Sequence, residues 1–331
     1  MSVFTILKNN FYRIIYKKSI IITAIIFVPL MIMAAVYFTG KMEIKGTIAV
    51  VSQHKSLNLS TKYFKIKNLD KKPNMSELLL NKYDAVLEKK EDGKFNITTI
   101  KGDKLKKTIQ NYLNSPQNIN KNIDIREKRG IGTNILGFLI MIILVQSIGT
   151  MVLYPEDRDF KTFRRILVSP ISEGKYLLAQ GIFNFIIIYI PVFLAILITK
   201  EVFNVNIGFS YGNLAILLSI ITFLGTSFAL FITSAIDDLD SSLMLGSAII
   251  TLTSIISGSF YSFSDNNKIL DIIINTLPQK SYLTLVQGVE NGKSILSYKF
   301  ELSYIVILIL TFFTLGSLMT KHNFKKRKIL N

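Results

Sequence analysis

The chain has 331 residues, 50% of them hydrophobic, and a net charge of +17. With a positive mean hydropathy of +0.40, this composition excludes a purely water-soluble globule and is typical of a chain with membrane spans. The absence of cysteine excludes disulfides, thiol catalysis and cysteine metal sites. The two histidines, His54 and His322, fall in segments predicted on opposite sides of the membrane, so no two-histidine metal site is expected.

Six stretches contain no Asp, Glu, Lys or Arg, and each is long enough to cross a hydrocarbon core of roughly 30 Å as a helix. The sequence therefore predicts an all-α polytopic membrane protein with six transmembrane helices and a small α/β extracellular domain inserted between helices one and two. The predicted spans are residues 19–39, 134–154, 176–199, 213–236, 241–263 and 302–320.

The first span follows a basic stretch with Lys8, Arg13, Lys17 and Lys18. A cleaved signal peptide also begins with a basic flank, but its apolar core has only about 7–15 residues and an A-x-A cleavage site follows it. Neither condition is met here. We therefore expect residues 1–40 to form a cytoplasmic N-terminus and a retained first transmembrane helix.

Residues 41–130 have short hydrophobic runs between polar stretches, as expected of a small water-soluble domain. Residues 45–51 and 83–88 read as strands, and a Glu91-Asp92-Gly93 turn leads to a return strand at 95–101. Residues 76–81 and 103–113 read as helices. The predicted fold is compact α/β. Its excess of lysine reads as a solvated face, with attraction to anionic headgroups or acidic wall polymers as the alternative.

The charge distribution predicts the topology. Short basic segments stay in the cytoplasm, which places both the N-terminus and the basic tail at 325–328 inside. Residues 41–130 then fall outside despite their net charge of +10, because long domains are translocated largely regardless of charge. The loop 155–175 falls inside, and residues 264–301 fall outside. The acidic loop 237–240 falls inside, against the charge trend.

The six predicted spans contain no Asp, Glu, His, Lys or Arg. Proton transfer, metal binding and ion coupling at membrane depth need such groups, so neither a membrane-embedded enzyme nor an ion-coupled carrier is expected. The polar residues of the spans are small or weakly polar, for example Ser147, Asn184 and Thr226. Helix packing and the lining of a route for an amphipathic substrate are both open for them.

A charged stretch follows the second span. Phe160, Phe163, Ile166 and Leu167 recur in it at helical spacing, with basic residues between them, which predicts a short amphipathic helix that ends before Pro170. The stretch reads Asp157-Arg158-Asp159-Phe160-Lys161-Thr162-Phe163-Arg164-Arg165-Ile166-Leu167-Val168-Ser169-Pro170-Ile171-Ser172, followed by Tyr176-Leu177-Leu178-Ala179.

This stretch resembles the signature "GTLERLLVSPIS…YLLGK" of the type 2 permease family of ABC (ATP-binding-cassette) exporters. Lys161 stands in place of the usual glycine, and Arg164 in place of the usual acid. Near the end of the fifth span, Ser257-Gly258-Ser259-Phe260-Tyr261 resembles the family's "SGxFF", without the proline that usually follows. With the six-span layout, the resemblance covers nearly the whole chain.

The resemblance implies a transport subunit and no enzyme: a five-helix transmembrane domain at 131–331 with a cytoplasmic coupling helix at 157–168 that docks on a separate ATPase. The implied coupling residues are Phe160, Phe163, Arg164, Arg165, Ile166, Leu167 and Pro170. The second and fifth spans are the implied pathway walls, with Gln146, Thr150, Ser254 and Ser257 as candidates. The chain itself would need no cofactor, because the partner uses the ATP. The chain is also expected to pair with a second copy of itself or with a sister permease, and to contact membrane lipids. No nucleic acid is expected as a partner.

The expected function is outward movement of a hydrophobic or amphipathic substrate, such as a drug, an antimicrobial peptide or a lipid, across a bacterial plasma membrane. Two alternatives stay open. The amphipathic stretch 157–167 would also suit a helix that lies on the inner membrane surface with its arginines at lipid phosphates. The chain as a whole would also suit a receptor or immunity protein whose outer domain captures a peptide or toxin.

Overall fold

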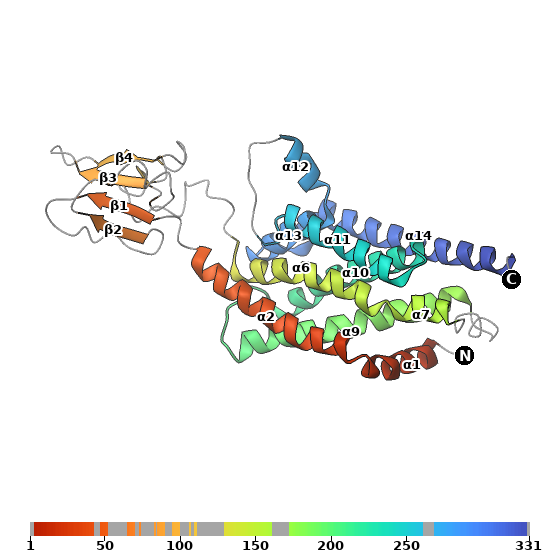
Figure 1. Cartoon of the computed structure of the whole chain (residues 1–331). Helices are drawn as coiled ribbons and strands as arrows, with labels where there is room; N and C mark the ends of the chain where they lie inside the picture. Colours follow the sequence, from red (N-terminus) through yellow and green to blue (C-terminus); the bar gives the residue numbers. More distant parts are fainter. Residues whose placement is uncertain are drawn as a thin grey trace. The chain divides into compact units, whose positions relative to one another are not determined.

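The computed structural model describes residues 3–42, 47–51, 65–69, 85–89, 95–99, 129–160, 172–260 and 268–329, with the single positions 73, 83, 106, 109 and 110. The chain divides into two compact units (Figure 1). One comprises Met1–Val36 and Arg129–Asn331 and is a bundle of helices, and the other is Tyr37–Lys128 and carries a small sheet.

The helical unit starts with α1 (Val3–Tyr16) and α2 (Lys18–Met42), which are separated by Lys17 alone. After the sheet unit the chain continues through α6 (Ile131–Thr150), α7 (Leu153–Asp159), α9 (Glu173–Glu201) and α10 (Tyr211–Ala235). It ends with α11 (Leu239–Ile256), α12 (Lys268–Asn275), α13 (Pro278–Glu290), the 3-10 helix η1 (Ile295–Tyr298) and α14 (Lys299–Ile329).

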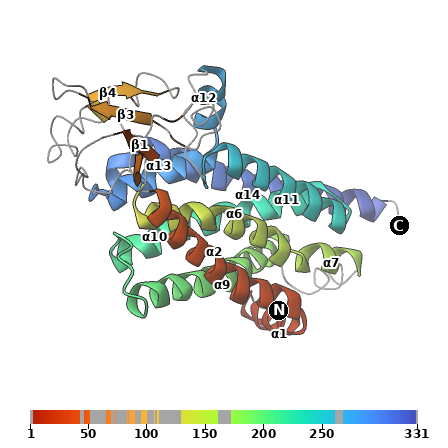
Figure 2. The same cartoon turned by 60° about the vertical axis from the view of Figure 1, so that its left-hand side comes forward.

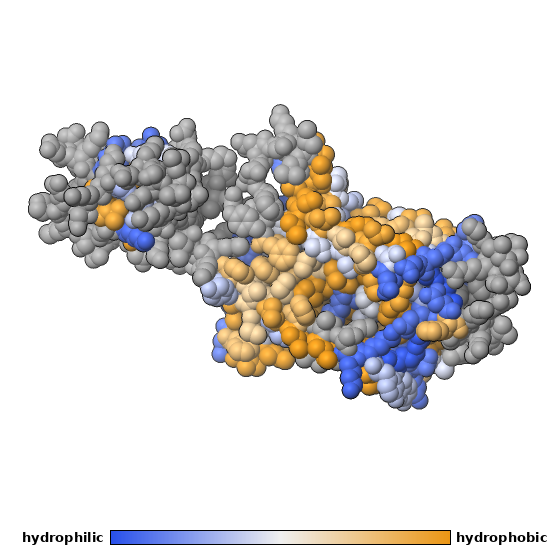
Figure 3. Space-filling view, in the orientation of Figure 1, coloured by the Kyte–Doolittle hydropathy of each residue, from blue (hydrophilic) through white to orange (hydrophobic). Residues whose placement is uncertain are grey.

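Five helical stretches of the described residues are long and apolar enough to cross a membrane: Ile131–Asp159, Glu173–Glu201, Tyr211–Ala235, Leu239–Ile256 and Ile295–Asn323. They coincide with the last five predicted spans. The first predicted span lies within α2, of which Ile26–Phe38 forms a shorter apolar helix in the described part, so six spans stay a prediction. An apolar zone covers the middle of the bundle, and a polar zone lies toward the end that carries α7 (Figure 3).

The centre of the bundle is α6. In the span that contains α6, 72% of the most apolar stretch is buried, whereas the value for the span that contains α14 is 11%. Helix α6 packs against α9, α10, α11 and α13. Close approach to α10 depends on Gly225, where a Cβ would lie 2.5 Å from Ser147 Oγ. Nearby, Asn184 of α9 donates from Nδ2 to the Ser147 backbone oxygen (2.7 Å) and accepts from the Thr226 hydroxyl (3.2 Å). For these residues the structure supports the packing interpretation.

The N-terminus and the C-terminus of the chain lie at the end of the helical bundle that also carries α7 (Figures 1 and 2). The α10–α11 connection lies there too, because Arg158 of α7 binds it. Its Asp238 caps α11 by accepting from the Ser241 backbone N–H (2.8 Å). Hydrogen bonds from the side chain and the backbone of Ser241 lower the pKa of the Asp238 carboxyl. The acidic loop therefore has a structural role as a helix cap.

The sheet unit contains four described strands in the order β2-β1-β3-β4: β1 (Thr47–Val51), β2 (Lys65–Leu69), β3 (Ala85–Lys89) and β4 (Phe95–Thr98). β1 pairs in parallel with β2 and β3, with Ala49 opposite Val86, and β3 pairs antiparallel with β4, as the predicted turn at 91–93 requires. Ala49, Tyr83 and Val86 form its small core. β2 was not predicted. The predicted helix 76–81 and most of 103–113 lie outside the described residues.

Candidate coupling site at α7

α7 is set off from α6 by a turn at Met151 and Val152. It begins at Leu153 and ends at Asp159, so the first residues of the predicted coupling helix form the last turn of α7 instead of a new helix start. The predicted coupling helix at 157–168 therefore overlaps α7 at residues 157–159, and the remainder of it stays a prediction. Residues 161–171 lie outside the described part of the chain.

Asp157 belongs to a closed ring of side chains that joins α1, α7 and α9. Arg13 Nη1 donates to Asp157 Oδ1 (2.8 Å), and the Tyr176 hydroxyl donates to Asp157 Oδ2 (2.6 Å). Gln180 Nε2 donates to the Tyr176 hydroxyl (2.8 Å), and Asn10 Nδ2 donates to Gln180 Oε1 (2.9 Å). Asn10 and Arg13 share one face of α1, and Tyr176 and Gln180 share one face of α9, so the ring closes. We call these five residues the Asp157 ring.

Burial makes the Asp157 ring selective for one arrangement of the three helices. The Asp157 residue is only 2% exposed, and a buried carboxylate is costly unless it is paired and hydrogen-bonded. Each hydrogen bond to a charged group contributes about 1.5–3 kcal/mol. The neighbouring Glu156 pairs with Lys17 and, at 3.4 Å, with Arg13. Because these side chains are partly exposed, that pairing adds only about 0–1 kcal/mol.

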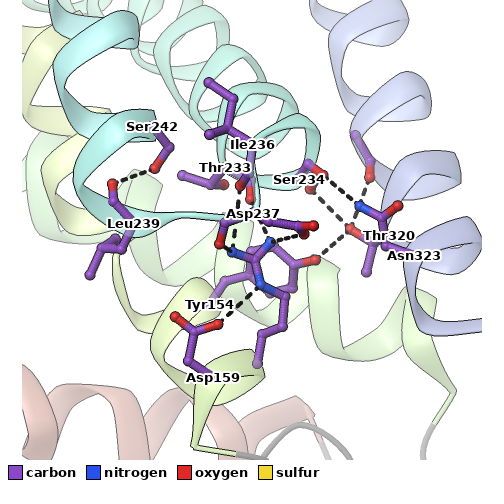
Figure 4. Close-up of polar contacts among 12 residues, drawn as sticks. Tyr154, Asp159, Thr233, Ser234, Ile236, Asp237, Leu239, Ser242, Thr320 and Asn323 are labelled. Atoms are coloured by element: carbon purple, nitrogen blue, oxygen red, sulfur yellow. Dashed lines mark hydrogen bonds and ion pairs between the residues drawn. The ribbon is translucent and has the colours of Figure 1, made fainter. Parts of the chain in front are cut away.

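Arg158, the next residue, binds a different helix of the bundle, α10, and the connection that follows it. Its guanidinium donates to the backbone oxygens of Thr233 (3.1 Å), Ile236 (3.5 Å) and Asp237. It also lies 3.5 Å from the carboxylate of Asp159 and 3.8 Å from that of Asp237. The last carbonyls of a helix have no partner within the helix and carry its negative dipole end, so a cation at the end of α10 is favourable. Figure 4 shows these acceptors gathered around one point.

Tyr154 connects the same helix to the end of α14. Its hydroxyl donates to Thr320 Oγ1 (2.9 Å), which lies 2.9 Å from the Ser234 hydroxyl of α10. Asn323 Nδ2 completes the group by donating to the Ser234 backbone oxygen at 3.0 Å (Figure 4). The Arg158 guanidinium stands 5.8 Å from the Tyr154 ring centroid, within the range of a cation–π contact.

These contacts bind the short α7 to four other helices. Asp157 holds α1 and α9, while Tyr154 and Arg158 hold α10 and α14. Through these contacts α7 is bonded, by buried and part-buried hydrogen bonds, to helices from both the first and the last part of the bundle unit.

Of the predicted coupling residues, only Phe160 is described. It ends α7 and is 75% exposed, so a large apolar side chain faces away from the bundle. The others lie outside the described residues: Phe163, Arg164, Arg165, Ile166, Leu167 and Pro170. Their role stays a prediction.

The predicted pathway residues do not converge on one point. α6 and α11 are neighbours, and Gly246 of α11 packs against Ile148, which is level with Gln146 and Thr150. Ser254 and Ser257 lie toward the other end, since the following Ser259 backbone packs against Gly137. The Thr150 hydroxyl bonds to backbone oxygens of its own helix, Gln146 is half-buried, and the buried Ser254 Oγ makes no hydrogen bond. A role in a substrate pathway stays a prediction for all four.

At the opposite end of the bundle, Glu290 of α13 caps the start of α6. Its two carboxylate oxygens accept from the backbone N–H groups of Gly132 (2.7 Å) and Thr133 (2.9 Å). The first N–H groups of a helix need such an acceptor, and a negative charge there is favoured by the helix dipole. Gly208 at φ +70° lies against the same carboxylate, where a Cβ would lie 2.9 Å from the side chain. This contact ties α13 to α6, and sequence spacing gave no signal for it.

The fold and its apolar helices define a multi-pass helical membrane protein, in which α7 is held by polar contacts to α1, α9, α10 and α14. Among the described residues there is no group of three or more His, Asp or Glu that could hold a metal ion. A family profile described as ABC-2 family transporter protein matches residues 17–318. This is most of the chain, so the chain belongs to the ABC-2 transporter family, as the resemblance at 157–172 predicted. No curated protein matches the chain in a direct sequence comparison.

Proposed function

We propose that this chain is the permease subunit of an ABC exporter, driven by a separate cytoplasmic ATPase that docks on residues 157–168. Two permease chains, either two copies or this chain with a sister chain, would move a hydrophobic or amphipathic substrate outward across a bacterial plasma membrane. In this arrangement both termini, α7 and the α10–α11 connection face the cytoplasm.

The observation that carries the proposal is the attachment of α7 on both of its sides. A docking segment can drive transport only if its displacement moves the helices that line the route. α7 leads directly into the predicted docking segment and is bound to α1, α9, α10 and α14 by buried contacts. Phe160, 75% exposed at its end, offers an apolar side chain to a partner.

The apolar composition of the predicted spans supports the proposed substrate class. They contain no Asp, Glu, His, Lys or Arg, so a route along α6 and α11 would offer hydroxyls, amides and apolar side chains only. Such a lining suits a drug, a lipid or an amphipathic peptide, and the energy for outward movement would come from ATP bound on the partner chain.

The proposal is tested by a docking variant. Phe163→Ala with Leu167→Ala removes apolar side chains of the kind that dominate interfaces, and is expected to cost a few kcal/mol of association with the ATPase. The ATPase that co-purifies with the tagged wild-type chain is identified by mass and quantified for each variant. Phe203→Ala is the matched control, because Phe203 is 68% exposed but lies in the α9–α10 connection.

We expect the double variant to insert normally while ATPase recovery and transport fall together, and the control to behave as wild type. Arg165→Glu should weaken recovery less at high salt if the partner surface is acidic. Wild-type recovery of the ATPase by the double variant would refute docking at this segment and favour a membrane-surface role. Absence of any ATPase with the wild type would favour the receptor alternative.

A further inference from the structure

The first turn of α6 has no cap from its own sequence. The residue at the N-cap position is Gly130, whose φ of −73° and ψ of 177° suit a capping residue but which has no side chain to accept a hydrogen bond. The turn contains no acidic residue, and Gly132 within it has a low helix propensity, because glycine loses more backbone freedom on ordering than other residues do. By itself this turn is expected to fray.

The missing cap comes from a distant part of the chain, the last residue of α13. Glu290 accepts hydrogen bonds from the backbone N–H groups of Gly132 (2.7 Å) and Thr133 (2.9 Å), two of the donors that a helix start leaves unpaired. Glu290 is part-exposed and forms no ion pair within the described part of the chain. Its carboxylate can therefore exchange these two donors for water without leaving a charge buried.

The same carboxylate side chain contacts the α9–α10 connection. Gly208 in this connection has φ +70°, a conformation that favours glycine, and a Cβ there would lie 2.9 Å from Glu290 Cγ. The two neighbours of Gly208 also contact α6, because Gly132 lies against the Ile207 backbone oxygen and the Phe209 ring. The start of α6, the α9–α10 connection and the end of α13 thus meet at Glu290.

The docked arrangement leaves one polar atom in this turn unsatisfied. Thr133 is buried, and its Oγ1 makes no hydrogen bond, which is unfavourable for a buried hydroxyl. A part-exposed carboxylate, a turn without its own cap and an unsatisfied hydroxyl are features of a contact that can open locally.

We propose that Glu290 is a latch at the end of the bundle opposite α7 (Figure 1). While its carboxylate is bound, the first turn of α6 is helical, and α13 and the α9–α10 connection lie against it. Release of the carboxylate removes the cap and both attachments in one step, so the three segments separate together. Glu290 is therefore a positioning residue for the opening of this end of the bundle, at a site remote from the proposed ATPase contact.

The test separates the capping of α6 from the attachment of the three segments. Glu290→Ala removes the carboxylate, and Gly130→Asp in the Glu290→Ala background returns a carboxylate to the N-cap position of α6 alone. Space is available for it, since the three atoms nearest to a Cβ at position 130 all belong to the Glu290 side chain. Glu201→Ala is the matched control, because Glu201 is an exposed carboxylate at the end of α9.

Backbone hydrogen exchange of each full-length variant in nanodiscs is followed by mass spectrometry for peptides within 130–139, 203–210 and 284–294. We expect Glu290→Ala to raise exchange in all three, by about tenfold at the start of α6, because a lost hydrogen bond to a charged group shifts an opening equilibrium by at least about that factor. The double variant should restore slow exchange in 130–139 and leave the other two peptides fast. Glu201→Ala should behave as wild type.

Three results would overturn the latch. Unchanged exchange in Glu290→Ala would show that the carboxylate holds nothing, and a rise confined to 130–139 would reduce Glu290 to a helix cap. Restoration of all three peptides by the double variant would lead to the same conclusion. If Glu290→Ala does not insert, Glu290→Gln takes its place, since it keeps one acceptor oxygen and should raise exchange in the same three peptides by a smaller factor. None of these measurements involves the ATPase, so their failure is separate from failure of the proposed function.

Discussion

Two adjacent residues of opposite charge, Asp157 and Arg158, connect α7 to different helices of the bundle. On a helix, neighbouring side chains point in different directions, so the carboxylate reaches α1 and α9 while the guanidinium reaches the end of α10. Each group is buried and binds partners from distant parts of the chain, although Arg158 Nε makes no hydrogen bond of its own. Exchange of either residue for an apolar one would leave those buried partners without their hydrogen bonds.

The contribution of the Asp157 ring to stability is tested most directly by Tyr176→Phe, which removes a single oxygen atom. The Tyr176 hydroxyl donates to Asp157 and accepts from Gln180, and Tyr176 is fully buried. Its loss leaves two buried groups short of a partner, so we expect a destabilisation of about 1–3 kcal/mol. Thermal unfolding of the detergent-solubilised protein measures the effect. Tyr12→Phe, at a site 57% exposed, should stay within about 0.5 kcal/mol of wild type. Equal effects of the two variants would mean that the ring contributes no stability.

Among the elements, α6 is the one around which the others assemble, and two of its contacts depend on glycines of neighbouring helices. A Cβ on Gly225 of α10 would lie 2.5 Å from Ser147 Oγ, and a Cβ on Gly246 of α11 would lie 2.7 Å from Ile148 Cδ1. Small residues of this kind let membrane helices approach closely, which is how packing and hydrogen bonds hold them together in lipid. Gly225 in the fourth span and Gly246 in the fifth are therefore explained by close packing, whereas Gly258 at the end of the fifth span has a positive φ of 80°.

Two glycine-to-alanine changes are expected to change the stability of the protein in opposite directions. Gly225→Ala crowds Ser147, whose hydroxyl is already bonded to the Ile143 backbone oxygen at 2.7 Å, so overpacking should destabilise by about 1–3 kcal/mol. Gly149→Ala in α6 meets nothing within 4 Å and should stabilise by about 0.5–1 kcal/mol through helix propensity. Thermal unfolding in one detergent compares both with wild type. Stabilisation by Gly225→Ala would contradict the close α6–α10 contact.

At the scale of the whole molecule, the bundle separates the loops into two groups. The termini, α7 and the α10–α11 connection lie at one end, and the Glu290 cap on α6 lies at the other. The predicted topology also places both termini and the loops 155–175 and 237–240 on one side of the membrane, and which side that is stays a prediction. It also explains the acidic loop at 237–240, which opposed the charge trend, since Asp237 faces Arg158 and Asp238 caps α11.

The topology itself is testable because the chain has no cysteine. Cysteines introduced singly as Lys72→Cys, Ser169→Cys and Asn266→Cys probe the predicted outer domain, the coupling loop and the last outer segment. On intact cells, an impermeant thiol reagent should label positions 72 and 266 and leave 169 unlabelled, and lysis should make 169 reactive. Labelling at 169 before lysis, or protection of either other position, would invalidate the layout.

Local patterns predicted most elements and only part of the site. Hydropathy located the five long apolar helical stretches after residue 130, and the Glu91-Asp92-Gly93 turn predicted the β3–β4 pairing. The strand β2 was not predicted, because Lys65 and Lys67 interrupt its apolar pattern. Its parallel pairing with β1 also joins segments that are separated in the chain. The signature at 157–172 pointed to α7, but the ring partners Asn10 and Arg13 stand in a helix that had been read only as a basic flank.

What the sequence determined alone is the apolar length of each span, the cysteine-free composition and the family signature, because all three are properties of continuous segments. What only the tertiary structure decided is the set of partners around α7. Asp157 is hydrogen-bonded to Arg13, which is 144 positions away in the sequence, and Arg158 to Thr233, which is 75 positions away. Such pairs form when the packing of apolar helices brings their ends together, and a buried charge then accepts only the arrangement that satisfies it.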